Sequence, residues 1–403
     1  MHAFKEPSNI GTTEEVNVSP RSRNPSRAIG SFFLWCLALF CALLFLAVLF
    51  WSKTRVYVQA AAVLDQLNGQ PVPRLMRPIA AMPLTTRTVT IPSAAGPVRA
   101  RLYAPVQRPD APGLVLVPGI TYLGMNEPRL MAFARSLAAC GLRVLTPELP
   151  DSRDYRIDPG DITALGDAAQ WLAHATGRRV GLMGLSFSGS LALLAAAEPS
   201  YARQISFVFA VGAYDNLFRV ATFYVTNADP LPDGNIERDT PNNYGPWILE
   251  YEHLEDFTDP ADTAPIRAVL RARLYNDPAL EKQLATELTP RQKKEYAGIL
   301  AHADQPLFRS DKKHAAEMAA VSPHGHLAGL HVPVYLLHGR EDNIIPFAES
   351  EWLAQDLPPG SLQEMLISPL VGHVGTTRVK SSVAGKWRLL HLLAQVMERA
   401  EHG

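Results

Sequence analysis

Cysteine is scarce in this chain of 403 residues, because only three are present and two of them, Cys36 and Cys41, lie within an uncharged apolar run. A lone cysteine cannot form a disulfide within its own domain, so we interpret Cys140 as a small buried apolar residue. Net charge is also nearly absent, at −1, and no basic patch interleaved with aromatics occurs. These two absences argue against a nucleic-acid partner. The length allows one large catalytic domain plus appendages.

The N-terminal part of the chain predicts a polar tail followed by a membrane helix. Residues 1–30 are rich in Ser, Pro and Asn, which is typical of a disordered tail. Residues 31–52 carry no charge and are long enough to span a hydrocarbon core of about 30 Å. A cleaved signal peptide is the alternative. Its apolar core would usually be shorter, although the alanines at 60–62 leave a later cleavage site open.

Charges beside this run bear on its orientation. Three arginines precede it, whereas Lys53 and Arg55 follow it. The positive-inside rule then mildly favours a single-pass protein with its main domain on the non-cytoplasmic side. Residues 53–84 contain a short helical pattern and a proline-rich stretch, which together predict a stalk or linker.

The rest of the chain alternates between apolar strands and amphipathic helices, which predicts a mostly parallel sheet flanked by helices. We assign residues 85–213 and 323–403 to the two parts of this α/β core. Residues 214–322 interrupt the alternation and predict a large, mainly helical lid. Strands are expected at 86–91, 98–103, 113–117, 142–146, 180–183, 205–211, 332–337 and 362–367.

One serine stands at a junction between a predicted strand and a predicted helix. The stretch from Arg179 to Leu191 reads RVGLMGLSFSGSL, with Ser186 after the apolar run and small residues around it. A tight turn of this kind exposes a nucleophilic serine at the edge of a sheet and requires small neighbours. The alternative is a serine that merely caps a helix.

A second loop could supply backbone donors to a developing oxyanion. The strand at 113–117 ends in Pro118 and Gly119, and the glycine allows a close approach of the backbone. We predict that the oxyanion hole consists of the backbone N–H groups of Ile120 and Phe187. An ordinary Pro-Gly strand end is the alternative interpretation.

An acid and a histidine follow in the order that a serine hydrolase needs. Asp342 comes just after the strand at 332–337, and His373 lies between glycines in a later loop. Asp342 would orient His373, which would act as the general base. Glu341 is the neighbouring rival, and one of these two carboxylates must face away from the site. Asp215 is the next candidate if neither serves.

Histidines at 324, 326 and 331 raise the possibility of a metal site. Their spacing does not form a convincing ligand set, and no cysteine or carboxylate lies close by in sequence. We therefore predict no metal and no cofactor-binding residues.

Taken together, these motifs resemble the α/β-hydrolase superfamily over about residues 85–400. The resemblance rests on the stretches 117–119, 184–189, 337–346 and 372–373. Two departures are Pro118, where many relatives have His, and Ser188, where most have Gly. The resemblance implies an eight-stranded, mostly parallel sheet, no cofactor, and an esterase, lipase, thioesterase or peptidase activity.

We therefore predict a serine hydrolase that cleaves a carboxylic ester or thioester through an acyl-enzyme. Its partners would be a small ester or lipid-like substrate and the membrane, and the sequence leaves its oligomeric state open. One alternative is a membrane-tethered binding protein on an altered hydrolase fold. Another is a serine peptidase or acyltransferase that uses the same residues. The sequence does not identify the acyl or leaving group.

Overall fold

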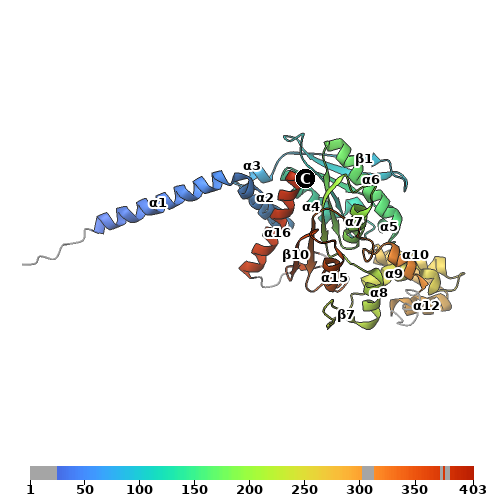
Figure 1. Cartoon of the computed structure of the whole chain (residues 1–403). Coiled ribbons are helices and arrows are strands. Elements are labelled where there is room, and N and C mark those ends of the chain that lie inside the picture. The colour runs from blue at the N-terminus through green and yellow to red at the C-terminus, as the bar shows by residue number, and fades with distance from the viewer. Residues whose placement is uncertain (1–24, 302–312, 373–374, 377–381) are drawn as a thin grey trace, which may run out of the picture. The chain divides into compact units, whose positions relative to one another are not determined.

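A computed structural model describes residues 25–301, 313–372, 375–376 and 382–403, in two units that divide after Thr54. The larger unit is built on an eight-stranded sheet of order β1-β2-β4-β3-β5-β6-β9-β10 (Figure 1). Its strands are β1 (Leu84–Ile91), β2 (Val98–Pro105), β3 (Gly113–Val117), β4 (Arg143–Pro147), β5 (Val180–Leu185), β6 (Ile205–Val211), β9 (Val334–Gly339) and β10 (Leu362–Ser368). β2 pairs antiparallel with β1 and β4, and the remaining pairs are parallel.

Side chains of the central strands alternate between two apolar cores, one on each face of the sheet. In β3, Val115 and Val117 enter one core, whereas Leu114 and Leu116 enter the other. A strand presents successive side chains to opposite faces, so a strand buried on both faces must be apolar throughout. The continuous apolar runs in the sequence have this cause.

Helices cover both faces of the sheet. On one face lie α6 (Pro159–Thr176) and α7 (Phe187–Ala197), and on the other lie α2 (Trp51–Leu67), α4 (Pro128–Ala139) and α16 (Val383–His402). Local capping fixes several helix ends. The Glu127 side chain accepts a bond from Leu130 N at the start of α4, and α6 ends at Gly177 with φ of 66°. Shorter helical segments are α3 (Arg77–Ala80), η1 (Gly124–Asn126), α5 (Pro150–Arg153) and α15 (Ala348–Asp356).

The segment predicted as a stalk, residues 53–84, differs from a free linker. Its first part, residues 53–67, belongs to α2, and one side of this helix is buried at Val56, Ala60 and Val63. These residues belong to the same apolar core as α4 and α16. Apolar positions spaced by three and four residues place one stripe of a helix against a core. From Arg55 onward the chain is therefore part of the larger unit.

The insertion predicted at 214–322 is mainly helical where the structure describes it. Its described elements are α8 (Leu217–Thr226), β7 (Ala228–Pro230), β8 (Ile236–Arg238), α9 (Tyr244–Glu252), η2 (Leu254–Asp256), α10 (Thr263–Leu274), α11 (Pro278–Glu287), α12 (Pro290–Leu300) and α14 (Ala315–Ala320). Buried residues of α8, α9 and α10 extend the core on the α6 and α7 face.

The smaller unit is described from Pro25, where α1 (Pro25–Leu49) begins inside the tail predicted at 1–30. The first 24 residues of that tail lie outside the described residues. Of the helices described, none alone is both long and apolar enough to cross a membrane. The pair Trp35–Leu46 and Trp51–Leu67, separated by a short break, has a suitable length and composition. The transmembrane helix stays a prediction.

Candidate active site

Ser186 occupies a sharp turn between β5 and α7. Its φ of 57° and ψ of −136° place a non-glycine residue in a region of the backbone map that side chains disfavour. The turn is held by a hydrogen bond of 2.6 Å from Ser186 N to Val211 O at the end of β6. Such strain persists only where the surrounding structure enforces it, and it is common at functional sites.

Glycines make this turn possible by allowing backbones to approach closely. A Cβ on Gly184 would lie 2.2 Å from Ser188 O, and a Cβ on Gly119 would lie 2.8 Å from the Cβ of Ser186. The Gly119 loop therefore lies directly against the serine. Ser188, which departs from the usual glycine, fits in the first turn of α7 with its side chain fully buried.

The two predicted oxyanion donors lie near Ser186. Phe187 follows it at the start of α7, and Ile120 follows Gly119; both residues line the cavity that also contains Ser186. Neither backbone N–H donates a hydrogen bond to another residue that the structure describes. Tyr244 of α9 donates from its hydroxyl to the carbonyl of Ile120 at 3.1 Å, which helps to fix this loop.

Asp342 is buried beyond the end of β9, whereas Glu341 is exposed. Of the two neighbouring candidates for the acid, Glu341 is therefore the one that is exposed to solvent. Oδ1 of Asp342 accepts hydrogen bonds of 3.0 Å from the backbone N–H groups of Ile344 and Ile345, which fix the orientation of the carboxylate. Nε2 of His338 lies 3.6 Å from Oδ2.

His373 lies outside the described residues, so its side chain carries no structural statement. The residues just before it are described, however. Val371 and Gly372 form β11 (Val371–Gly372), and a Cβ on Gly339 would lie 2.4 Å from Val371 O. The segment that leads into His373 therefore passes directly against the end of β9, three residues before Asp342.

Two neighbouring cavities meet at Ser186. The first, of about 240 Å³, is lined mostly by aliphatic and aromatic side chains together with Ser186 and Asp342, and we call it the apolar cavity. The second, of about 460 Å³, contains Ser186, Glu127 and Tyr244, and we call it the mixed cavity. Residues shared by both are Leu67, Arg129, Phe133, Leu185 and Ser186.

Several of these cavity residues have no signal in the sequence that indicates their place beside Ser186. Leu67 belongs to the predicted stalk and Tyr244 to the predicted lid, and neither has a local motif that would place it beside Ser186. Arg129 forms an ion pair of 2.8 Å with Glu127 at the start of α4. Burial raises the pKa of Tyr244 to about 12, so its phenol stays protonated at neutral pH.

Asp215, the reserve candidate for the acid, lies elsewhere. It is fully buried and forms an ion pair of 2.8 Å with Arg219, and it lines neither the apolar nor the mixed cavity. Arg219 also contacts Glu349 at 2.6 Å. Burial raises the pKa of Asp215 to about 6. This arrangement makes Asp215 part of a structural charge network.

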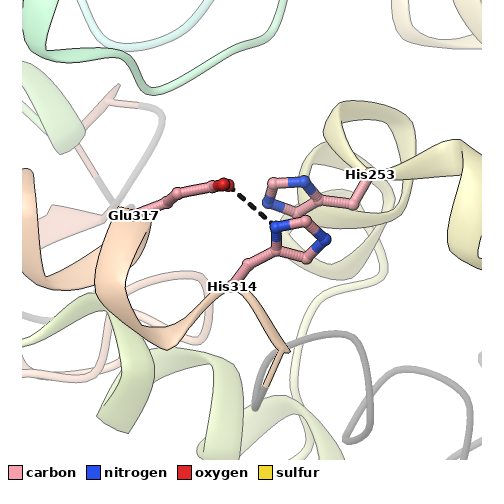
Figure 2. A group of neighbouring side chains, drawn as sticks. All are labelled: His253, His314 and Glu317. Atoms are coloured by element: carbon pink, nitrogen blue, oxygen red, sulfur yellow. Dashed lines mark hydrogen bonds and ion pairs between the residues drawn. The ribbon is translucent and has the colours of Figure 1, made fainter.

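One group of potential metal ligands in the described residues comprises His253, His314 and Glu317 (Figure 2). The two imidazoles stack with centroids 3.6 Å apart and planes 8° apart, and Nδ1 of His314 lies 2.8 Å from Glu317. A metal must lie close to the plane of each ring that binds it, which two stacked parallel rings cannot both satisfy. Nε2 of His314 also lies 2.9 Å from Asp256, so both ring nitrogens of His314 already contact carboxylates.

In two other such groups of potential ligands, an arginine already pairs with the carboxylates that would bind a metal ion. His324 has no carboxylate close to it in sequence, but in space it lies beside Asp215 and Asp356. Arg219 already forms an ion pair with Asp215. The other group consists of Asp259, Asp262 and Glu295, and Arg291 bridges its two aspartates at 2.7 and 2.6 Å.

Comparisons with known proteins found similar solved structures and one matching family model. Similar solved structures include a dienelactone hydrolase from Anabaena variabilis (16% identity, TM-score 0.41, 78% of this chain and 95% of that one). Others are 2-hydroxy-6-oxo-6-phenylhexa-2,4-dienoate hydrolase from Rhodococcus sp. strain RHA1 (16%, 0.43, 79% and 99%) and an esterase from Pyrobaculum calidifontis (14%, 0.43, 87% and 92%). No curated protein matches the chain. The model of the Alpha/beta hydrolase family matches residues 114–375, well over half of the sequence, and the chain therefore belongs to that family of hydrolases.

Proposed function

We propose that the protein is a serine hydrolase that cleaves a carboxylic ester or thioester through an acyl-enzyme on Ser186. His373 acts as the general base and Asp342 orients it. The backbone N–H groups of Ile120 and Phe187 stabilise the oxyanion. Asn242 and Tyr244 of the insertion line the mixed cavity, which supports a role of residues 214–322 as a lid.

The reaction proceeds in two halves. The Ser186 hydroxyl attacks the carbonyl carbon while its proton passes to His373, and the tetrahedral oxyanion forms between Ile120 and Phe187. His373 then gives this proton to the leaving oxygen or sulfur as the carbonyl reforms. Water repeats the sequence on the acyl-enzyme, with His373 taking its proton, and releases the acid and free Ser186.

The observation that carries this proposal is the backbone of Ser186. A φ of 57° on a serine at a strand-to-helix turn, with Gly119 pressed against its Cβ, is a costly arrangement that a mere helix cap does not need. Ser186 lines both cavities, which supports assignment of this turn as the nucleophile elbow.

Hydrolysis of p-nitrophenyl acetate by the full chain in detergent tests the proposal. Wild-type protein should release p-nitrophenol, and Ser186→Ala should lose nearly all of this activity. Ser188→Ala is a matched control, because it removes a hydroxyl only two residues away, in the first turn of α7. Equal rates for Ser186→Ala and wild type, or no hydrolysis by wild type, would overturn the proposal and favour a non-catalytic binding protein.

We also propose that residues 31–52 attach the protein to a membrane in a single pass, with the hydrolase unit on the non-cytoplasmic side. Support comes from the uncharged sequence of this run and from the apolar side chains that α1 exposes between Trp35 and Leu46. Protease accessibility of the hydrolase unit in sealed cells tests the orientation, since degradation requires external exposure.

A further inference from the structure

The apolar cavity beside Ser186 is closed by parts of the chain outside the family match. Leu64 and Leu67 of α2 and Leu389 and Leu393 of α16 line it, whereas the match covers residues 114–375. The matched part of the chain thus supplies Ser186, and two helices outside the match supply one wall of the space next to it. Figure 1 shows α2 and α16 side by side.

The lining of this cavity favours hydrocarbon. Eight leucine and phenylalanine side chains line it among the described residues, including Leu64 and Leu67 of α2 and Leu389 and Leu393 of α16. The polar side chains in its lining are those of Ser186, Asp342 and Arg129 among the described residues. Apolar cavities hold water poorly and bind apolar groups readily. Each methylene transferred into such a site improves binding by about fourfold.

The position of α2 is fixed by specific contacts. The side-chain amide of Gln59 donates to Cys140 O at 2.6 Å and to Ile79 O at 3.0 Å. Tyr57 stacks on Trp387 of α16 with centroids 5.5 Å apart. Arg55 pairs with Glu401 at 2.8 Å. These contacts set the rotation of the helix, so Leu64 and Leu67 are held against the cavity.

We propose that the apolar cavity binds a hydrocarbon chain of the ester and that Leu64 and Leu67 limit the length of that chain. This inference rests on the proposed hydrolase function and adds its substrate class. Gly372, which precedes His373, lines the same cavity. The hydrocarbon chain that occupies this cavity belongs either to the acyl side or to the alcohol side of the ester.

Two substrate series on the full chain in detergent test the inference and separate these sources. p-Nitrophenyl esters from acetate to laurate vary the acyl chain. Alkyl acetates from ethyl to dodecyl vary the alcohol, and their hydrolysis is measured by the release of acid. In one of the series, kcat/KM of the wild type should rise with chain length and then fall. Leu64→Trp and Leu67→Trp should each lower one ratio by about tenfold, namely kcat/KM for the octanoyl or octyl substrate divided by kcat/KM for the shortest substrate of the same series.

Matched variants complete the design. Leu64→Ala and Leu67→Ala should move the preferred length upward, which a folding defect would not do. Leu75→Trp makes the same change at a side chain that is 95% exposed and outside both cavities, and its ratio should equal that of wild type.

The possible failures are distinguishable. If wild type cleaves esters but the chain-length ratio is flat, or is unchanged in all four Leu64 and Leu67 variants, the inference is wrong and the hydrolase proposal stands. If wild type cleaves no ester of either series, both are overturned.

Discussion

At the scale of single residues, the geometry of the candidate site depends on Ser186, Gly119 and Asp342. Ser186 bears the backbone strain, Gly119 leaves room for it, and Asp342 is fixed by two backbone donors. Each role depends on a short distance that a single substitution changes. The sequence singles out all three residues as candidates, because glycine, serine and an acid after buried strands follow a recurrent order.

The choice between the two adjacent carboxylates can be tested directly. Asp342→Asn should keep the fold but support the wrong imidazole tautomer, with a loss in kcat on the order of 10⁴. Glu341→Gln should matter little, since Glu341 is exposed. Steady-state ester hydrolysis by both variants gives the comparison. A severe loss in Glu341→Gln combined with a mild one in Asp342→Asn would reverse the assignment.

Gly119→Ala tests the close contact behind the nucleophile. A Cβ at this position would lie 2.8 Å from the Cβ of Ser186 and 3.3 Å from its Oγ, so the hydroxyl must move. Because small misplacements of reacting groups are costly, kcat should fall by about 10²-fold. Gly298→Ala, where no atom lies within 4 Å of the added Cβ, is the control. Full activity of Gly119→Ala would show that this contact does not position the serine.

At the scale of elements, the strands were predicted more closely than the helices. Buried parallel strands require continuous apolar runs, so β3 and β6 have their expected bounds. Helix α7 begins at Phe187, whereas the apolar residues that indicate a helix in the sequence begin only at Leu191. Its first turn consists mostly of serine and glycine, whose weak helix propensity hides a helix that packing enforces.

Helix α2 shows what local sequence could not reveal. Its contacts reach residues more than three hundred positions away, as Tyr57 does with Trp387. A helical pattern predicts a helix but does not identify the partner of its buried face. The sequence therefore predicts a stalk here and does not reveal that the segment lies beside the candidate site.

Gln59→Ala tests whether α2 is an integral part of the fold. The change leaves the carbonyls of Cys140 and Ile79 without their side-chain donor, which should cost about 1–3 kcal/mol of unfolding free energy. Chemical denaturation of the hydrolase unit measures this loss of unfolding free energy. Gln66→Ala is the control, because the side-chain amide of Gln66 donates within its own helix, to Ala62 O at 3.2 Å. Equal stability of both variants would mean that α2 acts only as a spacer.

At the scale of the whole molecule, buried carboxylates make stability depend on pH. Burial raises the pKa of Glu252 to about 8 and that of Asp229 to about 7. The folded state then binds more protons than the unfolded state at intermediate pH. This stabilisation is complete below the ordinary carboxyl pKa and is lost as the pH rises through the raised values.

Thermal unfolding at about pH 5 and about pH 8 checks this sign. Wild type should be more stable at the lower pH, and Glu252→Gln should reduce the difference by on the order of 1 kcal/mol. Glutamine keeps an acceptor for the backbone N–H of Ile157, which Glu252 binds at 3.0 Å. Exposed Glu341→Gln should leave the pH slope unchanged. A slope of opposite sign in wild type, or one that Glu252→Gln does not alter, would contradict this account.

The central claim is that Ser186 is the nucleophile, and site mapping of a fluorophosphonate adduct on the full chain tests it most directly. Mass spectrometry of the digested protein should find the phosphonyl group on the peptide that carries Ser186, with the modified residue assigned by fragmentation. Ser188→Ala should be labelled as wild type is, and Ser186→Ala should remain unlabelled. Labelling of Ser186→Ala at the wild-type level, or an adduct on any other residue, would contradict the account.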